Sequence, residues 1–334
     1  QSPDSKTYNT QGNGLPFYQG NADFGETHPI TRVWCSAPVK VAEEGDILIS
    51  VRAPIGAMNM AVERCCIGRG LAALTPIRNK CSKQFLYYAL QSKVDSLIAQ
   101  GTGSTFKAIS KKVLEATCIP AYSTIEQEQI AETIGHVDNT IAAKRKQLAL
   151  LDQLVKSRFI ELFGDPIKNT QHRPTTDFVN VVTMQRGFDL PVQDRKQSGN
   201  MPVYGSNGVL DHHNQAKVCN GGVITGRSGT IGKVFYTKGA YWPLNTTLFS
   251  VDTHENNIIY LAHLVRMFNL DRFTGVPTLN RNKFHSAPII DVPIDEQNQF
   301  AAFVEQTDKS KLAIQKSLEK LETLKKALMQ EYFG

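Results

Sequence analysis

The sequence predicts an α+β chain made of two copies of one plan: a domain of mixed β-sheet and helices, followed by a long helix. Two observations carry this prediction. Residues 125–164 and 295–334 align without a gap at a constant offset of 170 residues. Each copy also has an apolar stripe that repeats every 3.5 residues, which is the seam of a coiled coil. An internal repeat of this size determines the architecture, and single motifs are interpreted within it.

The two aligned stretches are expected to form two long antiparallel coiled-coil helices that separate the domains. About 38 helical residues give a rod of roughly 57 Å, and such a helix with one apolar stripe is unstable alone in water. The alternative, burial on all sides in a globular core, is disfavoured by the polar runs Lys144–Gln147 and Glu319–Lys320. Ser123 or Thr124 can cap the first helix, with Gln127 placed to close a capping box.

The segments before the two helices repeat as well. A strand at Leu15–Tyr18 matches Met201–Tyr204, and both copies continue into a second, buried strand. The first copy is expected to contain a helix at Lys83–Ala99 and to end in a strand at Cys118–Pro120. The predicted boundaries are 1–122 and 167–293 for the domains, and 123–164 and 294–334 for the helices.

The two copies differ at their beginnings. The second copy has a lead-in at Asp177–Gly187, for which the first has no counterpart before Gln1. By the symmetry of the repeat, we expect roughly 15 to 20 residues to be absent from the front of the first domain.

Composition places few limits on function. The 334 residues carry a net charge of +6, with a pI of about 8.9, which permits a nucleic-acid partner without requiring one. No apolar run is long enough for a transmembrane helix, so no membrane partner is expected. The six cysteines fit neither a zinc site nor a disulfide scaffold, and we interpret them as reduced thiols of a cytoplasmic protein.

Several motifs recur in order in both halves. The first half has Gly45-Asp-Ile-Leu-Ile-Ser-Val-Arg52 followed by Ile55-Gly56, and the second has Gly221-Gly-Val-Ile-Thr-Gly-Arg227 followed by Ile231-Gly232. Each half then has a Gly/Thr loop, an Ile-Pro or Val-Pro exit, and a helix that opens Glu-Gln-x-Gln and ends Phe-Gly. With these motifs, essentially the whole chain resembles the specificity (S) subunits of type I restriction–modification systems, with a slightly truncated N-terminus.

The resemblance implies the fold and the partners. In this family, two target-recognition domains each read one half of a bipartite double-stranded DNA target, and two long helices hold the domains apart. Two methyltransferase (M) subunits dock on the S subunit and methylate adenine at N6 with S-adenosylmethionine, and restriction (R) subunits can join the complex. The resemblance therefore implies a non-enzymatic chain without a cofactor of its own.

The sequence also lacks the motifs expected of a catalytic or cofactor-binding chain. The sequence contains no Pro-Pro pair, so it lacks the D/N/S-P-P-Y/F/W motif that holds the target amine of an amino-methyltransferase. Residues 226–233 look like a phosphate loop but lack its spacing, and Val234 replaces the magnesium-binding hydroxyl. Gly68-Arg-Gly-Leu-Ala-Ala73 fits a dinucleotide fingerprint only as a lone match in a strand context. His212 and His213 have no metal-binding partner at a useful spacing.

DNA contacts are expected from loops at the ends of strands. Arginine and lysine hold phosphates, whereas Asn, Gln, Ser, Thr and Arg read base edges. Because two half-sites differ, we assign shared residues such as Arg52 and Arg227 to phosphate or scaffold roles, and base reading to the divergent loops. The candidates are Tyr18, Gln19, Asn21, Arg52, Thr105 and Lys107 in the first domain, and Tyr204, Ser206, Asn207, Arg227, Ser228, Lys233, Asn280, Arg281 and Lys283 in the second.

The helix pair is the expected docking surface for the methyltransferase subunits. Its polar interruptions, Lys144 and Arg158 facing Thr307 and Lys311, are the first places to look for a partner. The residues assigned to the helix pair and to docking are Ile134, Ile141, Lys144, Leu148, Leu151, Arg158, Ile314, Leu318 and Leu321.

Two other classes stay open at the sequence level. The chain could be a protein-interaction scaffold, with two binding modules on a coiled coil and no nucleic acid. It could also be the recognition module of a fused restriction–methylation enzyme.

Overall fold

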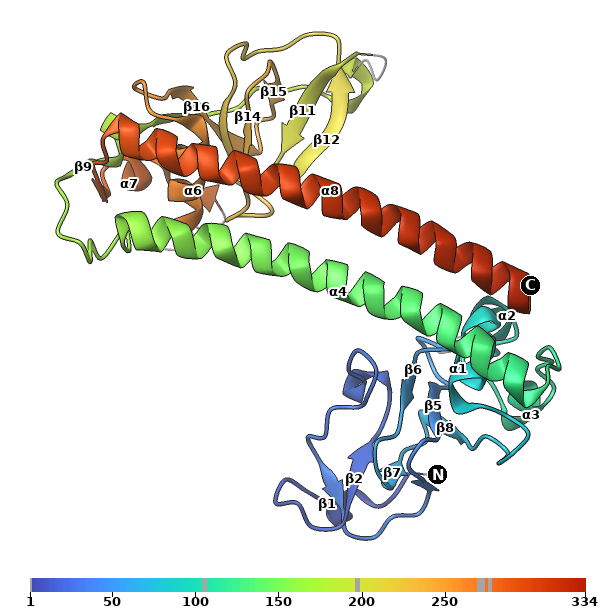
Figure 1. Cartoon of the computed structure of the whole chain (residues 1–334). Coiled ribbons are helices and arrows are strands. Elements are labelled where there is room, and N and C mark those ends of the chain that lie inside the picture. Colours follow the sequence, from blue (N-terminus) through green and yellow to red (C-terminus); the bar gives the residue numbers. More distant parts are fainter. Residues whose placement is uncertain (1, 104–106, 196–198, 269–273, 276–277) are drawn as a thin grey trace. The chain divides into compact units, whose positions relative to one another are not determined.

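The computed structural model describes residues 2–103, 107–195, 199–268, 274–275 and 278–334. Packing divides the chain into two compact units (Figure 1). The first unit contains Gln1–Lys144 and Ser317–Gly334, and the second contains Arg145–Lys316. Each long helix therefore contributes one part to each unit, whereas the boundaries predicted at residues 122 and 293 follow the sequence repeat.

The first unit contains two sheets. Strand β5 is the centre of a three-stranded sheet with the order β6-β5-β8, and a five-stranded sheet has the order β1-β3-β2-β7-β4. The strands are β1 Tyr8–Asn9, β2 Leu15–Tyr18, β3 Trp34–Cys35, β4 Val41–Ala42, β5 Ile47–Ser50, β6 Met58–Met60, β7 Cys65–Ile67 and β8 Leu71–Leu74. The helices before the long helix are η1 Ser5–Thr7, η2 Asn21–Asp23, α1 Lys83–Ser92, α2 Val94–Ala99 and α3 Lys111–Glu115.

The second unit repeats this plan with additions. Its main sheet has the order β10-β16-β13-β14, and a smaller sheet has the order β12-β11-β15. The strands are β9 Thr175–Asp177, β10 Thr183–Arg186, β11 Met201–Gly205, β12 Gly208–His213, β13 Gly222–Gly226, β14 Val234–Thr237, β15 Trp242–Pro243, β16 Thr247–Asp252, β17 Thr274–Gly275, β18 Thr278–Leu279 and β19 Pro288–Ile290. The helices are α5 Phe178–Val181, η3 Val192–Asp194, α6 Ile258–Met267 and α7 Arg281–His285.

The central strands confirm the strand predictions. Every residue of β5 and every residue of β13 is buried, as expected for an apolar run that has neighbours on both sides. Strands β2 and β11 lie at the two predicted Pro-containing segments, and each pairs in parallel with a strand that follows later in the chain.

The predicted helix at 83–99 is divided into two. The break lies at Lys93, whose backbone has φ −97° and ψ 0°. Helix α1 packs Phe85 and Ala89 into a cluster with the long helices, whereas Leu97 of α2 belongs to a different cluster with Ile49 and its neighbours. Because these clusters are separate, one straight helix would not bury both apolar faces.

The strand predicted at Cys118–Pro120 is also wrong, because residues 117–123 are not in a strand. Its counterpart in the second unit, β19, is a strand because it pairs with β9. In the described part of the first unit, no strand corresponds to β9, so this segment has no ladder to join.

The long helices are α4 Thr124–Phe163 and α8 Ile294–Phe333. The start of α4 corrects the predicted capping. The backbone N–H of Ser123 donates to Glu126 Oε2 at 2.8 Å, and the N–H of Glu126 donates to Ser123 Oγ at 3.3 Å. Glu126, not Gln127, therefore closes the capping box, because it stands three residues after the cap.

Gln127 instead ties the long helix to the domain before it. Its Oε1 accepts from the backbone N–H of Ser82 at 2.9 Å, and its Nε2 donates to the carbonyls of Lys80 and Tyr122. The side chain is buried, and Ser82 stands directly before α1. One amide group thus joins the start of α4, the start of α1 and the connection between them.

Gln297, 170 residues later, makes the same connection in the second unit. Its Oε1 accepts from the N–H of Asn257 at 2.9 Å, and its Nε2 donates to Asn256 Oδ1 at 2.6 Å and to the Val292 carbonyl at 2.8 Å. Asn257 is the N-cap of α6, the counterpart of α1. The repeat therefore preserves a buried joint as well as an apolar stripe.

The last phenylalanine of each long helix is an anchor. Within the second unit, Phe163 contacts Tyr260 of α6 with ring centroids 5.2 Å apart. Within the first unit, Phe333 contacts Phe85 of α1 at 5.3 Å. Both phenylalanines are fully buried, so each domain helix packs against the end of one long helix as well as the start of the other.

The two long helices run antiparallel in each unit. In the first unit, Lys325 Nζ lies 2.7 Å from Asp138 Oδ1. In the second unit, Lys311 Nζ lies 2.6 Å from Asp152 Oδ1. Asp138 precedes Asp152 in α4, whereas its partner Lys325 follows Lys311 in α8, as antiparallel pairing requires. Both lysine side chains are largely covered.

The seam is buried where a domain adds a third layer. Ile134 and Ile141 are buried, as predicted, and so are Phe159 and Phe163, which the predicted stripe omitted. The predicted seam residues Leu148, Leu151, Ile314, Leu318 and Leu321 are only half-buried, because two helices alone leave their outer flanks open.

Replacing the buried glutamine tests its structural role. We expect Gln297→Ala to lower the free energy of unfolding by about 2–4 kcal/mol, because the Asn257 N–H and the Val292 carbonyl would lose their partners inside the protein. Denaturant unfolding measures the change. Gln299→Ala is the matched control, since Gln299 is exposed on the same helix. Equal stability of the two variants would contradict the role assigned to Gln297.

Candidate nucleic-acid interface

The two domains bring the same pair of segments together. In the first unit, Arg52 forms a β-bridge with Ala108, and the Ala53 N–H donates to the Lys107 carbonyl at 3.1 Å. In the second, the Leu279 N–H donates to the Arg227 carbonyl at 2.9 Å. Each predicted loop therefore lies beside the predicted arginine at the end of a buried strand.

The second unit gathers several predicted residues on one surface. Lys233 Nζ donates to Asn207 Oδ1 at 2.6 Å, and the N–H groups of Arg227 and Ser228 both donate to the Thr246 carbonyl. Ser206 belongs to the same surface, since a Cβ built on Gly226 would lie 3.2 Å from the Ser206 Cβ. Five predicted residues from two segments, the β11–β12 turn and the β13–β14 turn, thus form one polar group.

Gly226 makes this approach possible. A side chain there would meet the Thr230 carbonyl oxygen at 1.9 Å, so the turn after β13 folds back over its own backbone. This close approach explains the glycine-rich sequence that resembles a phosphate loop without the need for a nucleotide.

A second basic group lies at the start of α7. Asn280 caps α7, because its Oδ1 accepts from the N–H groups of Asn282 and Lys283 at 3.1 and 3.2 Å. Arg281 and Lys283 are exposed. The cap therefore fixes the backbone from which these two cations extend into solvent.

In the first unit the predicted residues form two groups. Arg52 and Lys107 are exposed and adjoin each other through their backbones. Gln19 lies beside the turn from β7 to β8, since a Cβ on Gly68 would lie 3.1 Å from the Gln19 Cα. Asn21 begins η2 nearby in the chain, and Thr105 lies outside the described residues.

Tyr18 is a core residue and is removed from the candidate surface. Only 1% of it is exposed, its hydroxyl pairs with Thr31 Oγ1 at 2.8 Å, and it packs with Leu48 and Ile67. Its counterpart Tyr204 is half-buried against Tyr241, which leaves part of it at the surface.

Arg69 was not predicted but adjoins Gln19. It is exposed between Gly68 and Gly70 in the turn from β7 to β8, and both glycines lie against the Gln19 backbone. The sequence signal for this turn is a basic residue between two glycines, a pattern that also fits a dinucleotide fingerprint.

The long helices present a shallow apolar groove of about 600 Å³ in the second unit. Leu150 and Leu154 are about half exposed there. Of the predicted polar interruptions, Arg158 pairs with Glu161 at 2.9 Å, and Lys311 pairs with Asp152. These two cations are therefore engaged within the chain, and the exposed leucines are the feature that could receive a partner.

His263 lies in a charged pocket between α6 and the long helices of the second unit. Burial, together with the smaller effect of the nearby cations Arg266 and Lys311, lowers its pKa to about 3. Arg266 Nη1 lies 3.1 Å from His263 Nε2, and Asp152 and Asp308 also line the pocket. The fold therefore keeps this imidazole neutral.

The neutral histidine predicts acid sensitivity. The pKa is about 3 in the folded chain and about 6.5 in an unfolded chain, so the unfolded chain binds the proton more readily. The free energy of unfolding should fall as pH drops from about 6.5 toward 3, by at most about 1.4 kcal/mol per pH unit. Denaturant unfolding between pH 4 and 7 measures this slope.

The control separates His263 from the other titrating groups. His263→Gln should flatten the slope in that range, whereas His212→Gln, which changes an exposed histidine of the same unit, should leave it unchanged. An identical slope in both variants would show that His263 does not cause the acid sensitivity.

Comparison with known proteins defines the class. A family model described as "Type I restriction modification DNA specificity domain" matches residues 34–153 and 168–326. The chain therefore belongs to the type I restriction–modification DNA specificity family, as its sequence predicted.

Two named relatives come from Methanocaldococcus jannaschii. The putative type I restriction enzyme MjaX specificity subunit is 41% identical over 156 residues, which cover 47% of this chain and 37% of the relative. The type I restriction enzyme MjaIX specificity subunit is 28% identical over 151 residues, which cover 44% and 35%. The chain spans little more than a third of the length of these relatives, and both are named as specificity subunits, the non-catalytic class predicted from the sequence.

A solved structure shows the same fold. The S subunit of the type I restriction–modification system from M. genitalium aligns over 100% of this chain and 92% of its own, with a TM-score of 0.64 and 16% sequence identity. The predicted α+β class, with two repeated domains and two long helices, is confirmed.

Two further observations concern the described ranges. None of their helices combines the length and apolar character that crossing a bilayer requires. Within the same ranges, no three His, Cys, Asp or Glu side chains are grouped so that they could bind one metal ion.

Proposed function

We propose that this chain reads a bipartite double-stranded DNA target and positions methyltransferase subunits on it. The observation that carries the proposal is the duplicated arrangement of Arg52 with Lys107 and of Arg227 with Leu279. Each family-matched domain sets an arginine at the end of a buried strand beside a loop that differs between the copies. Two similar scaffolds with different loops are what two different half-sites require.

The chemistry of these surfaces suits DNA. Arg227, Arg281 and Lys283 can neutralise phosphates, and Asn207 and Ser206 can contact base edges in a groove. A rigid strand beneath the arginine fixes the register, whereas the loop sequence supplies discrimination. We assign Arg52 and Arg227 to the backbone and the divergent loops to the bases.

The partners follow from the family and from the helices. We propose that two methyltransferase subunits dock along the helix pair, with the half-exposed Leu150 and Leu154 in the contact, and that restriction subunits join this assembly. The modified adenine of each half-site would be flipped out of the duplex into the partner, which supplies S-adenosylmethionine. The chain itself contributes no reacting group.

The helix pair would set the distance between the half-sites, because both domains are joined to it through buried side chains. All six cysteines are free thiols, which supports the reducing, cytoplasmic compartment in which such a complex would act. No observation specifically favours an interaction scaffold without DNA or a module of a fused enzyme.

Salt-dependent binding tests the DNA contact. Arg227→Ala should weaken binding to duplexes of every sequence and reduce the slope of log K against log salt by about one, since one phosphate contact is lost. Titration of labelled duplex from 50 to 200 mM salt, with and without the methyltransferase partner, measures both. Lys316→Ala, an exposed lysine on α8, is the control and should leave the slope unchanged.

Two results would count against the proposal. An unchanged slope together with a lower melting temperature would assign Arg227 a purely structural role. A chain that binds no duplex at any salt concentration, with or without its partner, would favour the scaffold that acts only on proteins.

A further inference from the structure

Two adjacent apolar residues are exposed beside the polar group of the second unit. Val209 and Leu210 lie near the start of β12, directly after the turn that carries Ser206 and Asn207, and their exposed fractions are 49% and 51%. Strands β11 and β12 form this hairpin (Figure 1). In a strand with one covered face, alternation buries one of two neighbouring residues. The exposure of both residues therefore needs a structural cause.

The cause is a β-bulge. The register of the β11–β12 ladder shifts between Val203 and Tyr204, so that Leu210 is left between two pairs of the ladder. A bulge breaks the alternation and re-aims a side chain, and bulges are common beside functional sites. The Leu210 side chain lies across the hairpin, since a Cβ built on Gly205 would lie 2.8 Å from Leu210 Cδ2. The bulge thus directs Leu210 over the residue that precedes the turn.

The strand that carries Leu210 is firmly held. Asp211 pairs with Arg195 at 3.7 Å, and both of these side chains are largely covered. The ring of His213 packs edge-on against Trp242 with centroids 5.3 Å apart. A side chain on such a support can keep one position against a base pair, which discrimination between bases requires.

The first unit has a different side chain at the equivalent position. Strand β3 corresponds to β12, because these strands pair antiparallel with the aligned strands β2 and β11. Cys35 and His213 occupy the same position in the two ladders, and three residues before them stand Arg32 and Leu210. Both Arg32 and Leu210 are exposed. The two copies thus present a cation and an aliphatic side chain at one place on a shared scaffold, as two different half-sites require.

The surroundings of Leu210 indicate the chemistry of its partner. Lys233 Nζ donates to Asn207 Oδ1 at 2.6 Å in the adjoining turns, and cations of this kind attract DNA phosphates. The major groove of DNA accepts a two-stranded β-ribbon, and its distinctive apolar feature is the C5 methyl group of thymine. An aliphatic side chain within a polar and basic surface therefore matches a thymine.

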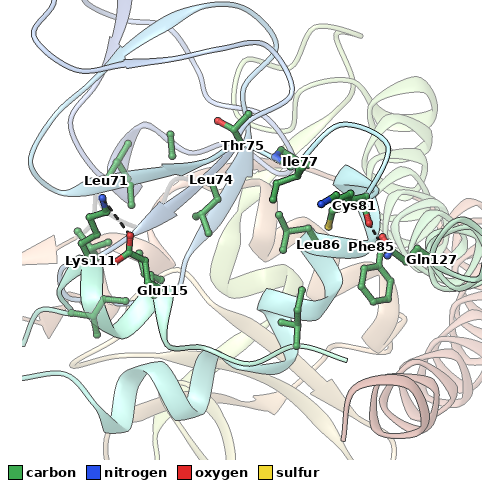
Figure 2. Close-up of a pocket in the computed structure, with 18 of the residues that line it drawn as sticks. Leu71, Leu74, Thr75, Ile77, Cys81, Phe85, Leu86, Lys111, Glu115 and Gln127 are labelled. Atoms are coloured by element: carbon green, nitrogen blue, oxygen red, sulfur yellow. Dashed lines mark hydrogen bonds and ion pairs between the residues drawn. The ribbon is translucent and has the colours of Figure 1, made fainter. Parts of the chain in front are cut away.

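The large apolar groove of the first unit is a different kind of surface. It lies alongside β8 and has a volume of about 1160 Å³. Figure 2 shows Leu71, Leu74, Ile77 and Leu86 lining it, together with the Lys111–Glu115 ion pair. A hollow of this size needs a partner with a continuous apolar surface, which a groove of DNA does not offer. A single leucine on a hairpin suits a single methyl group.

We propose that Leu210 recognises the C5 methyl group of one thymine in the half-site read by the second domain. This inference rests on the proposed DNA-reading function and deepens it, because it names an apolar residue outside the polar candidates and the base that it selects. The contact adds no hydrogen bond and neutralises no phosphate. It therefore affects base discrimination and leaves the salt dependence of binding unchanged, in contrast to the contact assigned to Arg227.

Deoxyuridine tests this contact, because it differs from thymidine only by the absence of the methyl group. The duplex selected from random sequences by the full chain with its methyltransferase partner is remade with each thymine replaced in turn by deoxyuridine. Dissociation constants are then measured by titration of labelled duplex. One replacement, in one half-site, should weaken binding of the unchanged chain about fourfold, the factor expected for one buried carbon group.

The variant Leu210→Ala should remove this sensitivity. It should bind the thymine duplex and the deoxyuridine duplex equally well, with the slope of log K against log salt unchanged. Val209→Ala is the matched control, since Val209 is equally exposed but stays in the ladder opposite Tyr204. This control should keep the fourfold difference between the two duplexes.

Several results would overturn the proposal. One is a selected duplex in which no thymine is sensitive, and another is a sensitivity that persists in Leu210→Ala or disappears in Val209→Ala. A third is weaker binding of Leu210→Ala to all duplexes by one common factor while the sensitivity remains, which would make the leucine a wedge between base steps. These results contradict this inference alone, whereas a chain that binds no duplex contradicts the proposed function on which it rests.

Discussion

The hydrogen bonds of one buried glutamine in each repeat determine how this chain is assembled. Gln127 and Gln297 each use both ends of the amide, accepting from the N-cap residue of a domain helix and donating to the segment that leads into the long helix. Removing such a side chain would leave several buried backbone groups without partners, which is more costly than losing the bonds alone. The joint therefore couples the direction of each long helix to the domain that precedes it.

The far end of each helix completes the arrangement. Phe163 packs on Tyr260, and Phe333 packs on Phe85, so each domain helix is covered from two sides. Lys93 Nζ donates to the Phe333 carbonyl at 2.6 Å, and Arg173 Nη2 donates to the Leu162 carbonyl at 2.9 Å. A cation at each helix C-terminus satisfies carbonyls that have no intrahelical partner and complements the helix dipole.

The repeat made much of this fold predictable. An offset that stays constant through two 40-residue segments predicts the long helices, and matching motifs predict β2, β5, β11 and β13. The role of Gln127 was missed because the side chain fits a local capping pattern equally well, and only the tertiary structure shows that it bonds Ser82. The strand predicted at Cys118–Pro120 failed for a similar reason, since a strand needs a partner that sequence periodicity does not reveal.

The candidate site was predictable in position more than in detail. The motifs predict that Arg227, Asn207 and Lys233 lie close together, because each stands in a loop at the end of a strand. Tyr18 was assigned to the surface from its place beside polar residues, yet β2 is covered on both faces, so that Phe17 and Tyr18 are both buried. The sequence did not predict Arg69 as a site residue, because only the structure places the turn from β7 to β8 beside Gln19.

We propose that the helix pair sets the spacing between two half-sites. The direct test inserts seven residues into each long helix, between residues 144 and 145 and between residues 316 and 317, because seven residues preserve the phase of the apolar stripe. The target is then determined by selection from random duplexes in the presence of the methyltransferase subunits. Our account predicts two unchanged half-sites whose separation has grown by about three base pairs, since seven residues add about 10 Å. An unchanged separation in a variant that still binds would contradict it.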